Sequence, residues 1–210
     1  MTPSVSFEFF PPKTVAGEAA LLTTAARLKG LAPAFVSVTF GAGGSTREPT
    51  AKAVTRLQDQ LGLDVAPHLT CVDATQSETL DIARAYRSQG VSKLVALRGD
   101  PRDGVEGVYS PSADGFPYAS DLVAGLQVID GLEVFVSAYP ETHPAEPNEA
   151  FDLQVLKQKQ DNGASAAITQ FFFDNRDFLR YRDKAAALGV TMSIIPGIMV
   201  PENIAGVSRF

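Results

Sequence analysis

Short apolar segments rich in β-branched and aromatic residues alternate along the chain with longer segments in which apolar residues recur every three or four positions. The first pattern is typical of buried strands and the second of amphipathic helices. Their alternation predicts an α/β fold with a parallel sheet. Strands are expected at residues 5–10, 34–39, 65–70, 93–97, 134–138, 166–170 and 192–195. Helices are expected at residues 17–29, 48–61, 76–89, 119–129, 148–161 and 175–188, with another from about residue 201.

Polar residues gather where the predicted strands end. In a (β/α)8 barrel the ends of successive strands meet at one mouth, whereas an open doubly wound sheet binds ligands mainly at its switch point. We therefore predict a TIM barrel and keep the doubly wound sheet as the alternative. Such barrels usually take about 250 residues, so we expect one catalytic domain over residues 1–210, with about seven units present and the last one missing. The polar positions are Glu8, Thr39, His68, Thr70, Arg98, Asp100, Tyr139, Glu141 and Gln170.

Glycine and proline residues mark helix ends and an irregular connection in this pattern. Gly90 and Gly189 follow two of the predicted helices, where glycine readily takes the left-handed conformation that ends a helix. Residues 100–118 are rich in both residue types and are too irregular for a helix. A connection of this length is often functional.

Composition narrows the class of protein. Hydrophobic residues make up 45% and charged residues 20% of the 210 residues, as in soluble globular proteins. The net charge of −6 disfavours nucleic acid and anionic membranes as partners. Cys71 is the single cysteine, and no signal peptide, apolar span or zinc-type spacing is evident, so we expect a cytoplasmic protein without a metal.

Glu8 is the first candidate for chemistry. It stands among phenylalanines in a segment that reads as a buried strand. A desolvated carboxyl group has a raised pKa and can donate a proton near neutral pH. The alternative is a core glutamate bonded to a neighbouring strand or to Lys13.

Two further segments follow strands. The sequence GAGGST at 41–46 lacks the third glycine of a dinucleotide fingerprint, so it is either a phosphate-binding turn or a flexible turn with a helix cap. Arg98 and Asp100 would suit an anionic group and a polar ring edge. Alternatively, they pair with each other and fix the long loop.

The remaining candidates have structural alternatives of their own. His68 and His143 are expected to form hydrogen bonds as neutral side chains rather than bind a metal. Cys71 is most simply a small buried residue. Gln170, followed by three phenylalanines, could bind a planar heterocycle, although core packing would also explain the aromatic residues. Lys157 and Lys159 would meet phosphates or lie on a solvated helix face.

Seven segments together resemble the methylenetetrahydrofolate reductase family, over essentially residues 5–210. They occur in barrel order: FEFFPPK at 7–13, FVSVT at 35–39, PHLTC at 67–71, ALRGD at 96–100, YASDL at 118–122, YPETHP at 139–144 and ITQFFFD at 168–174. The resemblance implies a flavoprotein that reduces 5,10-methylenetetrahydrofolate to 5-methyltetrahydrofolate with NADH or NADPH, in one-carbon metabolism and methionine supply. It also implies FAD as cofactor and a homo-oligomer like the short bacterial enzymes.

The resemblance also implies roles for individual residues. Glu8 matches the general acid, Asp100 an aspartate beside flavin and folate, Gln170 the amide that binds folate and nicotinamide, and Thr39 a nicotinamide contact. Phe210 matches an aromatic residue that packs on the substrate. The matched flavin contacts are Phe40, Ala42, His68, Arg98, Gly99, Tyr118, Ala119, Tyr139, His143, Asp152 and Lys159. Departures from the family pattern occur at Phe40, Val155, Gln158 and Gly206.

Two alternatives remain open. One is an inactive or unstable fragment of such a reductase, because the eighth strand and helix would be missing. The other is a non-flavin barrel lyase or aldolase, which would need an activated lysine or a metal. Lys13 is the only lysine near a predicted strand end that favours it.

Overall fold

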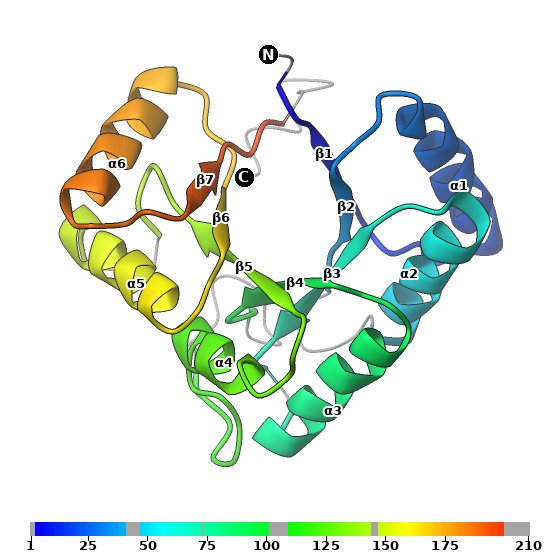
Figure 1. Ribbon diagram of the computed structural model, residues 1–210, viewed down its shortest axis with the longest axis horizontal. Helices are drawn as coiled ribbons and strands as arrows, with labels where there is room; N and C mark the ends of the chain where they lie inside the picture. Colours follow the sequence, from blue (N-terminus) through cyan, green and yellow to red (C-terminus); the bar gives the residue numbers. More distant parts are fainter. Residues whose placement is uncertain (1–2, 41–46, 73, 101–108, 144–146, 200–210) are drawn as a thin grey trace. The chain divides into compact units, whose positions relative to one another are not determined.

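The computed structural model describes residues 3–40, 47–72, 74–100, 109–143 and 147–199. Seven strands and six helices alternate within this part of the chain, which confirms the α/β class (Figure 1). The strands are β1 (Ser6–Phe9), β2 (Phe35–Val38), β3 (Val65–Thr70), β4 (Lys93–Leu97), β5 (Glu133–Ala138), β6 (Ala166–Thr169) and β7 (Ser193–Ile195). The helices are α1 (Val15–Lys29), α2 (Arg47–Leu61), α3 (Gln76–Ser88), α4 (Ala119–Leu126), α5 (Glu149–Asp161) and α6 (Asn175–Ala187).

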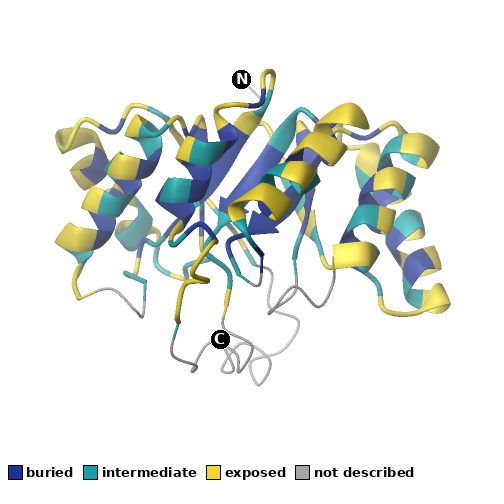
Figure 2. Ribbon diagram, turned by 90° about the horizontal axis from the view of Figure 1, so that it is seen from below, coloured by how far each residue is buried: buried dark blue, intermediate teal, exposed yellow. Residues whose placement is uncertain are grey.

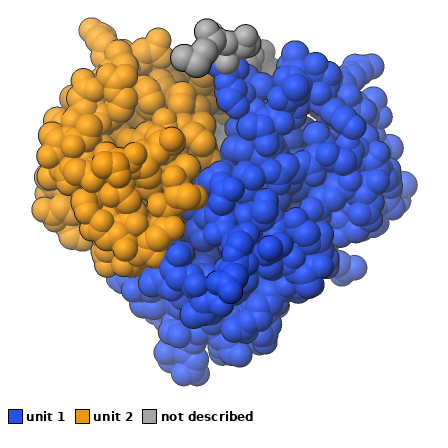
Figure 3. All heavy atoms as spheres, viewed as in Figure 1, with its two compact units in different colours: residues 1–135 blue, residues 136–210 orange. Residues whose placement is uncertain are grey.

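The chain divides into two compact units, residues 1–135 and 136–210 (Figure 3). The bounds of β5 include residues of both units. The strand order is β1-β2-β3-β4 in the first unit and β6-β7 in the second, and β5, which belongs to both, comes between β4 and β6 in that order. The pairs β1/β2, β2/β3, β3/β4 and β6/β7 are parallel. Neighbouring strands are therefore consecutive in the chain, as the alternation of strand and helix predicts.

Most element bounds agree with the prediction to within one or two residues. β3 and β4 match at both ends. Gly90 and Gly189 have φ angles of 86° and 82°, so both glycines end a helix in the left-handed conformation as predicted. α4 ends at Leu126, three residues early, because the Gln127 N–H bonds the carbonyl of Ala124 and tightens the last turn. The helix expected from residue 201 lies outside the described residues.

The core lies between the sheet and one face of each helix. Every residue of β2 and β3 is buried. Figure 2 shows buried strands and helices that are buried on one side and exposed on the other. Each helix thus covers the sheet with an apolar stripe, which is the predicted amphipathic arrangement.

The end of β7 packs closely on the end of β6. The Gly197 N–H donates to Oγ1 of Thr169 at 2.9 Å. A Cβ atom at position 197 would lie 2.1 Å from the carbonyl oxygen of Thr169, which no side chain tolerates. Glycine is therefore required here for close approach of two backbones.

None of the helices in the described ranges combines the length and the apolar character needed to cross a membrane.

Candidate active site

One face of the sheet in the first unit carries Glu8, Ser37, His68 and Thr70. Glu8 lies beside Ser37, and Ser37 beside Ala66, in the parallel register. Side chains alternate along a strand, so His68 and Thr70 share the face of Ala66. His68 and Thr70 are buried, whereas half of the Glu8 side chain is exposed. The face therefore combines a carboxyl group, an imidazole and two hydroxyls.

The Glu8 carboxyl group has two neighbours. Its Oε2 lies 3.4 Å from Oγ of Ser37, which donates to it, and 3.4 Å from Nε2 of His68. Both contacts are long for hydrogen bonds. Partial burial acts to raise the pKa of Glu8, but the hydrogen bond and charge of His68, together with Ser37, lower it further, so the pKa lies below its ordinary value.

The expectation of a buried Glu8 with a raised pKa is therefore wrong for this structure. β1 lies at the edge of the strands described for the first unit, so a neighbour covers it on one side only. Phe7 and Phe9 are only half-buried, and Phe10 is 76% exposed. Desolvation is then too weak to outweigh the polar partners.

Thr39 and Phe40 follow β2 and are half-buried. The Thr39 N–H donates to the carbonyl of Phe9 at 2.9 Å, and the Thr39 carbonyl accepts from Oγ1 of Thr50 at 3.0 Å. These bonds fix the strand end against β1 and α2. Ala42, with the rest of the segment 41–46, lies outside the described residues.

Gly99 allows the chain to turn sharply after β4. Its φ is 84°, and a Cβ atom would lie 2.9 Å from both Cβ of Thr70 and Cγ2 of Val72. Glycine is therefore required between Arg98 and Asp100. Arg98 is half-buried and Asp100 is exposed. Among the described residues they form no ion pair with each other, so the alternative of an Arg98–Asp100 clamp finds no support.

Tyr109 lies against Arg98, and Tyr118 lies against Tyr109. Tyr118 precedes α4, is 55% exposed and donates its N–H to Oδ2 of Asp121 at 3.0 Å. Ala119 follows as the buried first residue of the helix. The Tyr109 ring lies 6.2 Å from that of Tyr118, and the guanidinium carbon of Arg98 lies 4.7 Å from the Tyr109 centroid. Tyr109 belongs to no recognisable motif, and the one sequence signal that includes it is the long irregular segment 100–118.

Cys71 is buried, and its thiol is unreactive. Its Sγ donates to the carbonyl of Leu97 at 3.4 Å. Burial, helped by the charge of Asp121 and opposed by Arg98, raises the pKa of the thiol to about 12. The thiolate is the reactive form of cysteine, so the prediction of a small structural residue is confirmed.

The second unit buries two charged residues. Oδ2 of Asp152 accepts the backbone N–H of His143 at 3.1 Å, and Nζ of Lys159 donates to the carbonyl of Ser137 at 2.9 Å. The side chains of Asp152 and Lys159 come from α5, and both residues are buried. The rings of Tyr139 and His143 meet edge to face at 4.6 Å. These contacts tie α5 to the end of β5.

The two lysines of α5 behave differently. Nζ of Lys157 donates to Oδ2 of Asp161 at 2.6 Å on the outer side of the helix, as the solvated-face alternative expects. Lys159 follows Leu153 and Leu156 at three-residue spacing and shares their buried stripe. For Lys159, the solvated-face alternative is wrong.

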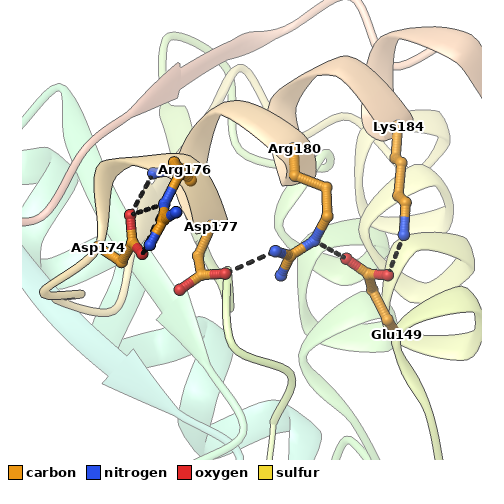
Figure 4. A network of polar contacts seen from close by, with 6 residues as sticks. All are labelled: Glu149, Asp174, Arg176, Asp177, Arg180 and Lys184. Atoms are coloured by element: carbon orange, nitrogen blue, oxygen red, sulfur yellow. Dashed lines mark hydrogen bonds and ion pairs between the residues drawn. The ribbon is translucent and has the colours of Figure 1, made fainter.

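A surface network fixes the start of α5 (Figure 4). Glu149, its first residue, contacts Arg180 and Lys184, which are one turn apart on α6. Arg180 also contacts Asp177. Asp152 lies one turn after Glu149, so the same network holds the helix turn that carries this buried carboxylate.

Gln170 is exposed immediately after β6. Its Oε1 accepts the N–H of Phe171 at 3.0 Å. The phenylalanines contact other rings: Phe171 meets Phe173 edge to face at 5.6 Å, and Phe172 stacks on Phe178 at 5.2 Å. Packing thus accounts for Phe172, whereas Phe173 is 60% exposed.

The described residues contain no group of three or more histidine, cysteine, aspartate or glutamate side chains arranged to hold a metal ion. Phe210 lies outside the described residues. The described candidates form one set in the first unit, from Glu8 to Ala119, and another in the second unit, from Tyr139 to Gln170.

Comparison with known proteins decides the family. The model of the family described as "Methylenetetrahydrofolate reductase" matches residues 1–210. The chain belongs to this family. It is 44% identical over 209 residues to 5,10-methylenetetrahydrofolate reductase of Escherichia coli, covering 99% of this chain and 68% of that enzyme. A "probable methylenetetrahydrofolate reductase (NADH)" of rice is 38% identical, covering 97% of this chain and 36% of the rice protein.

Among solved structures, one similar fold is that of an uncharacterized protein from Clostridium thermocellum that binds two copies of 5-methyl-5,6,7,8-tetrahydrofolic acid. The TM-score is 0.60 at 16% identity, covering 95% of this chain and 73% of that one. At this identity the likeness shows the fold alone. The membership in the methylenetetrahydrofolate reductase family confirms the resemblance drawn from the seven sequence segments, and with it an enzyme of this type.

Proposed function

We propose that this chain reduces 5,10-methylenetetrahydrofolate to 5-methyltetrahydrofolate with NADH or NADPH as electron donor. The observation that carries the proposal is the family match over residues 1–210. The polar strand ends of the first unit support it, because a reductase of this kind needs a proton donor and groups that hold planar, anionic molecules.

FAD is the proposed cofactor, and when bound it would supply the hydride-transfer chemistry between the nicotinamide and the methylene carbon of the folate. The described residues fit such a group. The buried Oγ1 of Thr70 has no hydrogen-bond partner among the described residues, and Tyr118 exposes its ring. Arg98 offers N–H donors that no described carboxylate occupies. We expect Thr39, Phe40, Ala42, His68 and Gly99 to contribute further contacts from the same unit.

In the second unit we propose that Tyr139 and His143 contact FAD. Asp152 holds the backbone of His143, and Lys159 holds β5 just before Tyr139. The buried charges thus orient the residues that meet the cofactor, in addition to any direct contact of their own.

The remaining polar groups are proposed to bind and protonate the substrate. Gln170 is exposed, and the N–H donors of its side-chain amide suit the polar edge of a folate or nicotinamide ring. Asp100 is exposed and supplies a negative charge that stabilises a cationic folate. Phe210 is proposed to pack on the substrate.

Glu8 is the proposed proton donor. Its pKa is low in this structure because half of the side chain meets water and His68 lies nearby. A planar substrate laid on the carboxyl group would remove that water, and desolvation raises the pKa of an acid. Glu8 would then take up a proton as substrate binds and give it to the folate nitrogen.

The architecture we propose is a (β/α)8 barrel, supported by strands in chain order, by the parallel pairs β1/β2, β2/β3, β3/β4 and β6/β7, and by a helix after each of the first six strands. We further propose a cytoplasmic homo-oligomer. The lyase alternative loses its main support, because Lys13 is exposed and an activated lysine needs burial or a neighbouring cation.

An anaerobic absorbance titration of the 210-residue chain tests the function. With FAD added, we expect a bound flavin spectrum that bleaches with NADH and recovers when methylenetetrahydrofolate follows. Bleaching without recovery would refute folate reduction. A folded chain that binds no FAD would refute the flavin mechanism for this chain and favour the inactive fragment.

A further inference from the structure

We propose that Tyr109 is a positioning residue for Arg98, holding its guanidinium by the flat face so that the N–H edge stays available to an anionic or polar ligand. The proposal rests on the proposed function, in which that ligand is the flavin cofactor. The guanidinium carbon of Arg98 lies 4.7 Å from the centre of the Tyr109 ring. This is well within the range of a cation–π contact.

The mode of contact matters for ligand binding. A carboxylate partner would occupy the N–H donors of an arginine, as paired hydrogen bonds do. A tyrosine ring engages the π face and leaves all five donors at the edge. Among the described residues Arg98 makes no ion pair, and its Nε donates only a long hydrogen bond of 3.4 Å to the carbonyl of Gly99. The ring is therefore its main support there.

Tyr109 is itself held in place. Its hydroxyl donates to the carbonyl of Pro117 at 2.7 Å, and its ring contacts that of Tyr118 at 6.2 Å. Burial, foremost, raises the pKa of Tyr109 to about 12, so the hydroxyl remains a neutral donor at physiological pH. Next to Pro117, Phe116 is buried against Gly125 of α4, so the support extends to a helix.

The test measures FAD affinity by quenching of flavin fluorescence in wild type, Tyr109→Leu and Tyr109→Phe. Leucine removes the aromatic face, whereas phenylalanine keeps it and loses only the hydrogen bond to Pro117. We expect Tyr109→Leu to raise the dissociation constant about three- to tenfold, the size of one partly exposed cation–π contact. Tyr109→Phe should stay within about twofold of wild type. Thermal unfolding checks that each variant is folded.

A double-mutant cycle separates positioning from general packing. In an Arg98→Met background, Tyr109→Leu should produce no further loss of FAD affinity. If the loss persists there, or if leucine and phenylalanine weaken binding equally, the proposal is overturned. Unchanged affinity in folded Tyr109→Leu also overturns it.

A measurement without ligand keeps this proposal distinct from the flavin function. In wild type, the Nε–H proton resonance of Arg98 should show an upfield ring-current shift that disappears in Tyr109→Leu and persists in Tyr109→Phe. Absence of that shift in wild type refutes the contact, whether or not FAD binds. If the shift is present and wild type binds no FAD, the contact exists, but its role in cofactor binding and the proposed function both fail.

Discussion

The two units use their polar residues in opposite ways. In the first unit, Glu8 is half-exposed and its contacts with Ser37 and His68 are both 3.4 Å long. In the second, Asp152 and Lys159 are buried and make bonds of 3.1 and 2.9 Å to backbone groups. Short hydrogen bonds to the backbone compensate a buried charged group for the loss of water. A half-exposed carboxyl group with long contacts, such as that of Glu8, can instead exchange its partners for a ligand. The contrast supports the proposal that Glu8 meets the substrate, and it shows Asp152 and Lys159 holding the backbone in place.

The largest effect is expected from Glu8→Gln. The amide keeps the shape but cannot donate a carboxyl proton, so folate reduction should fall about 100-fold or more. Bleaching by NADH in the absence of folate should stay within about threefold of wild type. Stopped-flow absorbance separates the two half-reactions. Equal loss in both would contradict a specific role in protonation.

In the second unit, Gly197→Ala probes close packing. The added methyl group would meet the carbonyl of Thr169, a backbone atom that cannot rotate away. We expect the free energy of unfolding to fall by about 2–3 kcal/mol, measured by urea denaturation. Gly30→Ala is the matched control, because Gly30 has a φ of −60° that alanine also adopts. A similarly small change in unfolding free energy in both variants would show that the backbone at the ends of β6 and β7 can move apart to accommodate a methyl group.

Lys159→Met tests whether the buried charge is a support. The substitution leaves the carbonyl of Ser137 without its donor, and we expect a loss of about 1–2 kcal/mol in urea denaturation. Lys157→Met provides the control on the same helix, since it removes only a surface pair with Asp161, a loss of about 0.3–0.5 kcal/mol. Equal losses of unfolding free energy in the two variants would show that the buried Lys159 supports the fold no more than a surface lysine does.

The smallest effect concerns pH. The pKa of Glu8 is lowered in the folded chain, so its ionised form stabilises the fold above the unfolded-state pKa. That contribution should be lost as pH falls from about 5 through the lower folded-state pKa. Urea midpoints of wild type and Glu8→Gln should therefore differ more at pH 6 than at pH 3. A difference in urea midpoint that grows toward pH 3 would mean that burial raises the pKa of Glu8 by more than His68 and Ser37 lower it.

Local pattern predicted the fold well. β3 could be placed to the residue because an apolar run that is buried on both faces has clear ends, and Gly90 and Gly189 mark helix ends by their own conformational freedom. The end of α4 was less predictable. Apolar residues continue to Ile129, and only the backbone contact of Gln127 shows that the α-helix has stopped.

The site was predicted in part, since motifs name residues but not their surroundings. Exposure of Glu8 depends on which strands flank β1, and its pKa depends on a histidine sixty residues away. Burial of Lys159 is visible in its three-residue spacing from Leu156, a signal outweighed by the usual exposure of lysine. Tyr109 meets Arg98 only through the folding of a loop, which no local pattern encodes.

The low reactivity of the Cys71 thiol has a practical consequence. With a pKa of about 12 and a buried sulfur, it should resist alkylating reagents at neutral pH. Because the chain has no other cysteine, a cysteine introduced at exposed Phe10 would be the sole reactive thiol. A fluorescent label attached there would report the arrival of ligands beside Glu8 against a silent background.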